Sequence, residues 1–111
     1  MADAPNAIAV NADNFDHEVV QSSVPVLVDF WASWCPPCMM LKPELKALAP
    51  ELAGRAKIAF VDVDENPELA EAFAVRGIPA LFVLKDGEIV DQWTGFMPRA
   101  AVKARLENHL A

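Results

Sequence analysis

The chain has 111 residues, 54% of them hydrophobic, with two cysteines and a net charge of -7. A chain of this length can bury a core without disulfide cross-links, so we expect a single domain over residues 1–111. The negative charge repels phosphate groups, which argues against nucleic acids and membrane surfaces as partners. The N-terminus lacks the basic start and the apolar stretch of a secretory signal, and no apolar run is long enough to span a membrane. We therefore expect a cytoplasmic protein.

The first part of the chain has the pattern of a strand, a helix and a second strand. A short apolar run at 8–10 predicts a strand, and apolar residues at helical spacing predict a helix over 11–21. The nearly continuous apolar run at 24–31 is typical of a central strand that is covered on both faces. Asp29 places an acid inside this strand. Because a buried carboxylate is costly, Asp29 is a candidate functional residue, although it could also be a structural acid satisfied by its neighbours.

The middle of the chain continues the alternation of helix and strand. Apolar positions predict a helix over 35–52, which Pro43 should bend because its ring removes one backbone donor. Gly54 should end this helix, and residues 57–63 predict another strand. A short helix is expected over 67–74, with a proline at its first position.

The last part of the chain predicts a hairpin and a closing helix. Apolar runs at 81–84 and 88–94 flank the pair Asp86-Gly87, which is a strong signal for a turn between antiparallel strands. Residues 98–110 predict a helix with one apolar side. The predicted order is β-α-β-α-β-α-β-β-α, which indicates an α/β fold with a mixed central sheet and helices on both faces.

Both cysteines lie in the motif Trp34-Cys35-Pro36-Pro37-Cys38, directly after a predicted strand. A thiol at a helix start faces unpaired N–H groups and the positive end of the helix dipole, which favours the thiolate. Pro37 has no N–H, so the N–H of Cys38 is the donor left for the Cys35 sulfur. We predict that Cys35 is the nucleophile and that Cys38, on the same helical face, is the resolving thiol.

Cys38 must lose a proton before it can attack, and Asp29 is the candidate base. Burial in an apolar strand should raise the pKa of the Asp29 carboxyl toward neutrality, where the carboxyl can exchange a proton with Cys38. We therefore predict three catalytic residues: Cys35, Cys38 and Asp29.

Other uses of the cysteines are less well supported by the sequence. A zinc site normally needs four ligands, and His17 and His109 stand near opposite ends of the chain, so we expect no metal. Inert core thiols would not explain the tryptophan and prolines around them. The acids Asp62, Asp64 and Glu65 are expected to form a solvated strand end rather than a metal cluster.

Further motifs accompany the dithiol in one order along the chain. They are Val28-Asp29-Phe30-Trp31-Ala32, Lys42-Pro43, Val61-Asp62-Val63-Asp64-Glu65-Asn66-Pro67, Gly77-Ile78-Pro79 and Gly95. With the dithiol, these motifs resemble the thioredoxin family over essentially the whole chain. The resemblance implies a thioredoxin fold and a protein-disulfide reductase without a bound cofactor, in which the redox group is the Cys35–Cys38 disulfide.

The same resemblance implies partners and a docking surface. The partners would be client proteins with disulfides and thioredoxin reductase, a flavin enzyme that draws electrons from NADPH, and the chain would be a monomer. The Ile78–Pro79 bond would be cis and would face the dithiol, where the Ile78 backbone offers a strand-like edge to a substrate peptide. The expected substrate-binding residues are Trp34, Pro36, Pro37, Gly77, Ile78, Pro79 and Gly95, with Phe96 beside them.

The chain departs from the common family pattern at several positions. Pro36 stands where thioredoxins usually have Gly, which should stiffen the turn and alter the redox potential. Phe60 stands where many bacterial members have a Lys close to the buried acid, so the Asp29 carboxyl should lie in still more apolar surroundings. Met39 replaces a common basic residue and Ala80 a common Thr.

Two other functions remain open at this point. The chain could be a binding subunit that keeps the thioredoxin shape and uses its apolar face in a larger complex. It could also be a dedicated electron donor to one peroxidase or reductase, as the pair Pro36-Pro37 and the missing basic residues would suit. The intact dithiol, Asp29 and Pro79 favour the general reductase.

Overall fold

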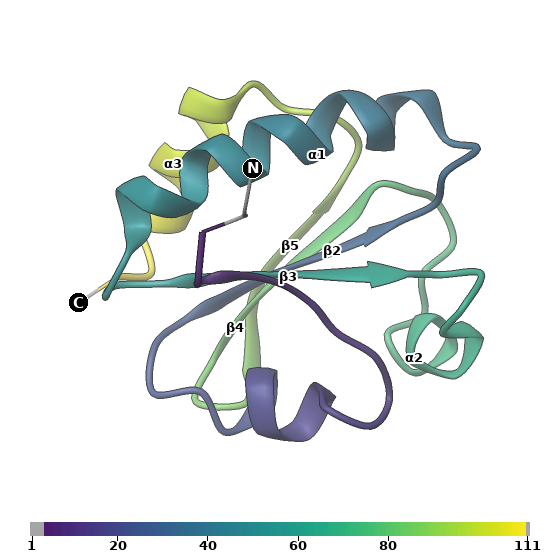
Figure 1. The fold of residues 1–111 in the computed structure, drawn as a ribbon, viewed down its shortest axis with the longest axis horizontal. Helices are drawn as coiled ribbons and strands as arrows, with labels where there is room; N and C mark the ends of the chain where they lie inside the picture. Colours follow the sequence, from purple (N-terminus) through teal and green to yellow (C-terminus); the bar gives the residue numbers. More distant parts are fainter. Residues whose placement is uncertain (1–3, 111) are drawn as a thin grey trace.

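A computed structural model describes residues 4–110 as a five-stranded mixed sheet with helices on both faces (Figure 1). The predicted α/β fold class and element order are confirmed. The elements are β1 (Ala7–Ala9), η1 (Asp16–Val20), β2 (Val26–Trp31), α1 (Pro36–Leu48), η2 (Ala49–Leu52), β3 (Lys57–Asp62), α2 (Pro67–Ala72), β4 (Ala80–Lys85), β5 (Glu88–Thr94) and α3 (Arg99–Glu107).

The strand order β1-β3-β2-β4-β5 puts β2 at the centre of the sheet. β1 and β2 run parallel to β3, β4 is antiparallel to β2, and β5 is antiparallel to β4. Asp29 on β2 is paired with Phe60 on β3 and with Leu81 on β4. Because paired residues point to the same face of a sheet, these three side chains share one face.

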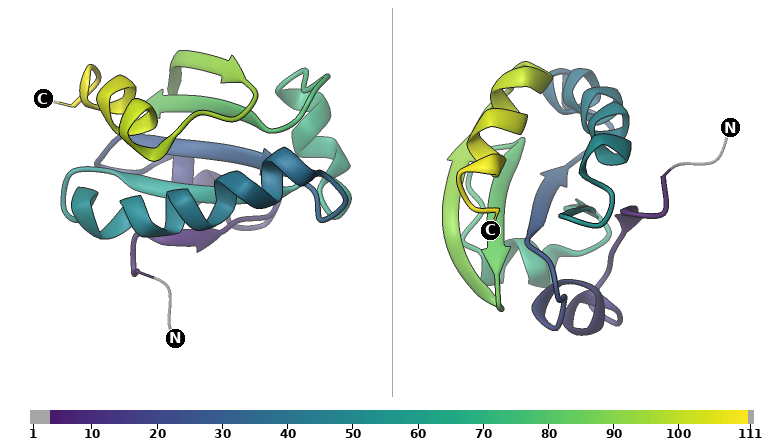
Figure 2. Two further views of the ribbon diagram at one scale, coloured as in Figure 1. Left: turned by 90° about the horizontal axis from the view of Figure 1, so that it is seen from above. Right: turned by 90° about the vertical axis from the view of Figure 1, so that its left-hand side faces the viewer.

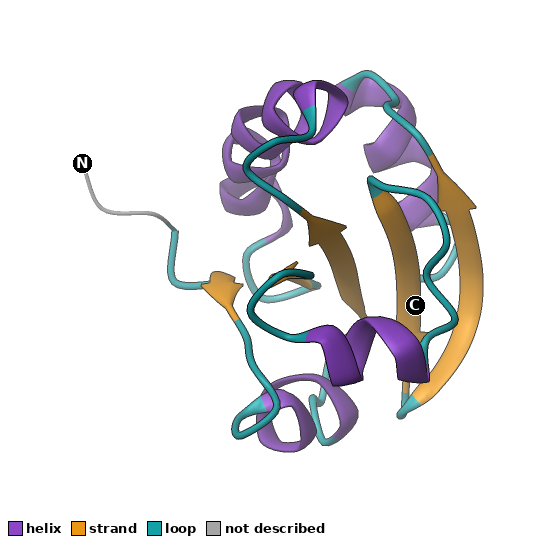
Figure 3. Ribbon diagram, turned by 90° about the vertical axis from the view of Figure 1, so that its right-hand side faces the viewer, coloured by secondary structure: helices purple, strands orange, loops and turns teal. Residues whose placement is uncertain are grey.

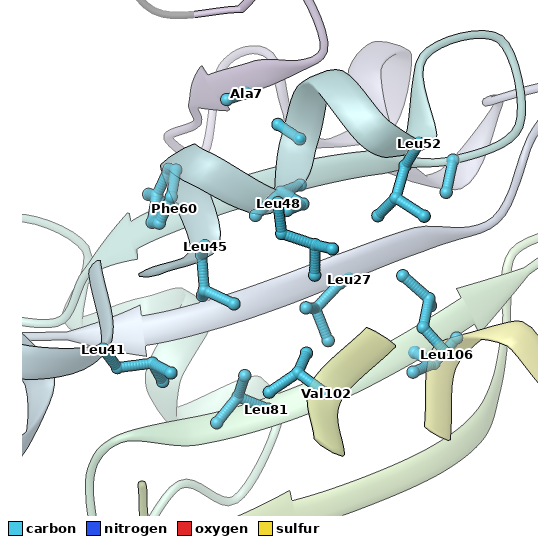
Figure 4. Close-up of a cluster of buried hydrophobic side chains, with 14 residues drawn as sticks. Ala7, Leu27, Leu41, Leu45, Leu48, Leu52, Phe60, Leu81, Val102 and Leu106 are labelled. Atoms are coloured by element: carbon cyan, nitrogen blue, oxygen red, sulfur yellow. The ribbon is translucent and has the colours of Figure 1, made fainter. Parts of the chain in front are cut away.

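Helices lie on both faces of the sheet (Figures 1 and 2), and a hydrophobic core fills the space between sheet and helices on each face. α1 and α3 cover the face that carries Leu27 and Leu81, and the α1 leucines project onto these residues (Figure 4). The other face packs against η1 and α2, where Phe30, Phe73 and Phe82 make edge-on and tilted ring contacts. The side view in Figure 3 shows the sheet between the two helical layers.

The helix expected at 11–21 was predicted too long. Asn11 Oδ1 accepts the backbone N–H groups of Asp13 and Asn14 at 2.9 and 3.1 Å, so this segment forms a turn. The regular part, η1, begins only at Asp16, and Gln21 N donates to the Asp16 carbonyl at 2.9 Å, which closes a wide turn of the π type.

The helix expected at 35–52 is divided near its end. α1 contains Pro43 and ends at Leu48, and the chain continues as the short 3₁₀ helix η2. Pro50 explains the change, because it has no N–H for the next α-helical hydrogen bond. The predicted hairpin is confirmed, since Asp86 and Gly87 both have positive φ, at 53° and 78°.

The remaining helices are shorter than predicted. α2 ends at Ala72 rather than at 74, because Ala74 has a φ of 54° and leaves the helical region. α3 covers Arg99–Glu107 instead of 98–110, with Pro98 as its first flanking residue. Within residues 4–110, no helix has the length and apolar character that crossing a bilayer requires.

Candidate active site

Cys35 lies just past the carboxyl end of β2 and immediately before α1, as the sequence predicts. It has extended backbone angles, φ -102° and ψ 104°, and its Sγ accepts the N–H of Cys38 at 3.2 Å. Pro36 and Pro37 fill the first two helical positions and donate no hydrogen bonds. The sulfur is therefore the cap of α1, at the positive end of the helix dipole.

Cys35 and Cys38 are joined by a disulfide, with their Cα atoms 5.2 Å apart. Cys35 retains 4% exposure, whereas Cys38 has none and faces the sheet from the inner side of α1. Of the two cysteines, Cys35 is thus the one that another molecule can reach. This difference in access fits an attacking thiol and a resolving thiol in that order.

Asp29 is fully buried on the sheet face that α1 covers. Neither of its carboxyl oxygens accepts a hydrogen bond within the part of the chain that the structure describes. Burial raises the pKa of Asp29 from 3.8 to about 7, and the positive charge of Lys42 opposes this rise. Asp29 can therefore gain or lose a proton near neutral pH, in the same layer as Cys38.

Lys42 is the residue near Asp29 that the sequence analysis did not identify. Its Nζ lies 3.4 Å from the centroid of the Trp31 ring and 5.6 Å from that of Phe60. Phe60 is buried and pairs with Asp29, which fits the expected more apolar surroundings, and α1 in addition supplies the positive charge of Lys42. The position of Lys42 could have been predicted from its spacing, because it follows Cys38 by one helical turn and so lies on the same side of α1.

A pocket of about 420 Å³ opens between α1 and β3 at this point. Trp31, Lys42 and Phe60 are among the residues that line it. Trp31 lies two positions after Asp29 on the same face of β2, and Phe60 is paired with Asp29 on β3. The pocket is therefore lined by residues next to the Asp29 carboxyl group.

The loop before β4 brings three predicted docking residues to the dithiol. The Ile78–Pro79 bond is cis, and the Ile78 carbonyl oxygen lies 3.7 Å from Sγ of Cys35. Gly95 N donates to the Pro79 carbonyl at 2.8 Å, and its φ of 100° favours glycine. Gly77 is exposed and precedes Ile78 in the same loop.

Trp34 directly precedes Cys35 and is 65% exposed. Its indole Nε1 donates to Asp64 Oδ2 at 2.8 Å. The Asp62 carboxylate in turn accepts the backbone N–H of Asp64 at 2.9 Å, which holds the acceptor in place. This hydrogen bond was not predicted for the solvated strand end expected at Asp62, Asp64 and Glu65, because nothing local links two residues that are 30 positions apart.

Several known thioredoxins are similar to this chain. The model of the family described as Thioredoxin matches residues 6–108. A thioredoxin of Staphylococcus haemolyticus is 50% identical over 103 residues, which cover 93% of this chain and 97% of that protein. A thioredoxin of Chlorobaculum thiosulfatiphilum is 44% identical over 97 residues, covering 87% and 90%. One of Acidithiobacillus ferridurans is 42% identical over 110 residues, covering 99% and 100%.

The geometry and the similarity agree. A disulfide at the start of a helix, with the carbonyl oxygen of a cis Ile78–Pro79 bond 3.7 Å from its outer sulfur, fits a thiol–disulfide exchange site. The family model and these relatives cover nearly the whole chain. The chain belongs to the thioredoxin family of thiol–disulfide oxidoreductases.

Proposed function

We propose that this chain reduces disulfides of client proteins, with Cys35 as the nucleophile, Cys38 as the resolving thiol and Asp29 as the base. The observation that carries the proposal is the Cys35–Cys38 disulfide at the start of α1, whose outer sulfur accepts the Cys38 N–H at 3.2 Å. This donor and the helix dipole stabilise negative charge on the Cys35 sulfur. The thiolate is the form that attacks a disulfide.

The exchange transfers two electrons in two steps. The Cys35 thiolate attacks one sulfur of the client disulfide, a bond forms between the two sulfurs, and the other client sulfur leaves as a thiolate. Cys38 then loses its proton and attacks the Cys35 sulfur, which forms the Cys35–Cys38 disulfide and releases the second client sulfur as a thiolate. The client thiolates take up protons, so the client is reduced and the chain is oxidised.

Asp29 would accept the proton that Cys38 gives up. A carboxyl with a pKa of about 7 can take this proton and return it to solvent at neutral pH. The pocket that borders the residues around Asp29 supports this exchange with solvent. We expect Asp29→Asn to slow release of the client from the mixed disulfide by about 100-fold, while formation of the mixed disulfide stays fast.

The proposed docking surface surrounds the Cys35 sulfur. The Ile78 carbonyl offers a backbone acceptor to a client segment next to its attacked sulfur. The exposed Trp34 ring and the partly exposed Ile78 side chain would cover the rest of the segment. The residues proposed for this surface are Trp34, Pro36, Pro37, Gly77, Ile78, Pro79 and Gly95.

Reduction of insulin disulfides tests the activity directly. The wild type should reduce insulin with dithiothreitol as the electron source, and Cys35→Ser should not. Cys38→Ser should instead accumulate a mixed disulfide with the client, because the resolving step is lost. A wild type that performs no better than dithiothreitol alone would contradict the proposed function.

The family implies a reductase as the electron donor. We propose the finer scheme in which the electrons come from NADPH through a flavin-containing thioredoxin reductase. NADPH oxidation in the presence of such a reductase, this chain and insulin should require all three proteins. The single domain, the monomeric state and the cytoplasmic location remain predictions, which size-exclusion chromatography and cell fractionation can test.

A further inference from the structure

The outward side of α1 is apolar along its whole length. A helix on the surface of a protein normally turns charged and polar residues to solvent. Here the inward residues Leu41, Leu45 and Leu48 are fully buried, as expected (Figure 4). The outward side carries no charge, and we name it the α1 ridge; it consists of Pro36, Met39, Met40, Pro43 and Ala47, extended by Pro50 of η2.

The α1 ridge is continuous, because its members follow one another at three or four positions. All of them are exposed, and Met39 and Met40 retain 44% and 60% of their exposure. At about 1.5 Å per residue, the ridge runs about 20 Å from the dithiol toward the far end of the helix. Figure 2 shows that α1 runs along the outside of its layer.

The charges beside the α1 ridge interact within the chain. On one flank, Glu44 pairs with Arg99 at 3.8 Å and Glu51 pairs with Lys103 at 2.8 Å. On the other flank, the ammonium group of Lys42 lies over the Trp31 ring. A partner on the ridge therefore meets apolar surface bordered by charges that are already engaged, which suits an apolar segment better than a charged one.

We propose that the α1 ridge binds an apolar segment of the client polypeptide, next to the client cysteine. This inference rests on the proposed function and names its substrate class: disulfides flanked by apolar residues, such as those exposed in incompletely folded chains. An extended segment advances about 3.3 Å per residue, so the ridge accommodates about six client residues.

The occupant follows from the position of the ridge. It begins at Pro36, directly after the nucleophile, so a client held in the mixed disulfide lies at one end of the ridge. Because the ridge begins beside the attacking sulfur, one client segment can contact the ridge while its disulfide is being attacked, so the apolar contact raises the rate of attack. The two methionines add side chains that adapt to different apolar partners.

The test compares two synthetic disulfide peptides that differ only in the residues three to six positions from the cysteine. One peptide carries leucines there and the other serines, in versions with the changes on either side of the cysteine. The chemically reduced wild type should react about tenfold faster with the leucine peptide, a difference of about 1.4 kcal/mol. The ratio of the two rates, leucine peptide over serine peptide, should fall close to one in the double variant Met40→Gln, Ala47→Gln. A change in the reactivity of the dithiol affects both rates equally and so leaves this ratio unchanged.

Ile89→Gln with Val90→Gln is the matched control. These exposed apolar residues lie on β5, away from α1, and Ile89 is 49% exposed. The control should keep the wild-type ratio. Equal rates for both peptides, or an equal loss of the ratio in the control, would overturn the proposal while leaving the disulfide reductase intact.

Two other outcomes identify other causes. If the wild type reduces neither peptide, the proposed function fails rather than the ridge. If the reduced wild type forms dimers that Met40→Gln, Ala47→Gln dissociates, the ridge binds a second copy of the chain and the client assignment is wrong. Size-exclusion chromatography of the reduced proteins measures this directly.

Discussion

The ammonium group of Lys42 lies 3.4 Å from the centroid of the Trp31 ring, and its charge acts on the buried carboxyl of Asp29. Trp31 and Asp29 are on the same face of β2, and Lys42 approaches that face from α1. A cation from the helix that carries the dithiol therefore adjusts the acid beneath it. Asp29 on β2 and Lys42 on α1 would together set the pH at which Cys38 can give up its proton.

Removal of this cation should raise the pKa of Asp29 further. Lys42 stabilises the carboxylate, so in Lys42→Met the pKa of Asp29 should rise above about 7. The pH at which the rate of the resolving step changes should rise with the pKa of Asp29. Titration of the Asp29 carboxyl by NMR measures the shift, and Lys46→Met, one helical turn farther along α1, is the control. An unchanged or lower pKa in Lys42→Met would contradict the assigned influence.

Asp29 should also make the folded chain less stable as the pH rises. Its pKa is about 7 in the folded chain against an ordinary value of 3.8, so the folded state holds the proton more tightly. The contribution of the protonated Asp29 to the free energy of unfolding is complete below about pH 4. It declines as the pH rises toward 7 and does not change further above that pH. The difference of about 3 pH units corresponds to about 4 kcal/mol.

Urea unfolding at several pH values tests this linkage. Between pH 4 and pH 8, the free energy of unfolding of the wild type should fall by about 4 kcal/mol relative to that of Asp29→Asn. The comparison of slopes removes any constant cost of the buried amide. Parallel pH profiles for the two proteins would show that Asp29 ionises with its ordinary pKa.

The hydrogen bond from Trp34 to Asp64 should matter for clients and little for stability. Asp64→Ala removes the acceptor of the indole N–H at an exposed site, so the free energy of unfolding should change by less than about 0.5 kcal/mol. Reduction of insulin should slow severalfold, because the indole beside Cys35 is no longer held. Asp64→Asn keeps an oxygen acceptor and should restore most of the rate.

Glu65→Ala is the control for charge in this experiment. Glu65 is an exposed acid next to Asp64, and its removal changes the net charge equally without touching the indole. Equal slowing in Glu65→Ala and Asp64→Ala would mean that charge, and not the position of Trp34, limits the reaction.

The C-terminal helix should depend on Asp91 of β5. Arg105 Nε and Nη2 each donate to this carboxylate at 2.8 Å, and His109 lies 3.1 Å from it. These contacts, Arg105 first, hold the pKa of Asp91 well below its usual range despite partial burial. Asp91→Asn should therefore lower the melting temperature at pH 7.

The pH dependence of this effect has the opposite sign to that of Asp29. A depressed pKa contributes stability above the unfolded value near 3.8, and this contribution is lost as the pH falls. The melting temperatures of wild type and Asp91→Asn should converge in acid. Arg99→Met breaks the looser contact with Glu44 at 3.8 Å and should have a smaller effect at pH 7. A melting temperature unchanged by Asp91→Asn would show that the contact contributes nothing.

Most strands and helices could be predicted from the sequence because their signals are local. The apolar run of β2, the proline pair that begins α1 and the Asp86-Gly87 turn each depend on a few consecutive residues. The errors came where side chains and prolines compete with the backbone pattern. Asn11 stabilises a turn in place of a helix, and Pro50 converts the last turn of the expected helix to 3₁₀.

The chemistry of the dithiol follows from a few consecutive residues. The order of Cys35, two prolines and Cys38 after an apolar strand specifies which sulfur caps the helix and which N–H it accepts, because helix geometry relates residues three apart. The surroundings of the dithiol depend instead on the folded arrangement of distant segments. The Trp34–Asp64 and Cys35–Ile78 contacts join residues 30 and 43 positions apart, and sheet order rather than local pattern brings such residues together.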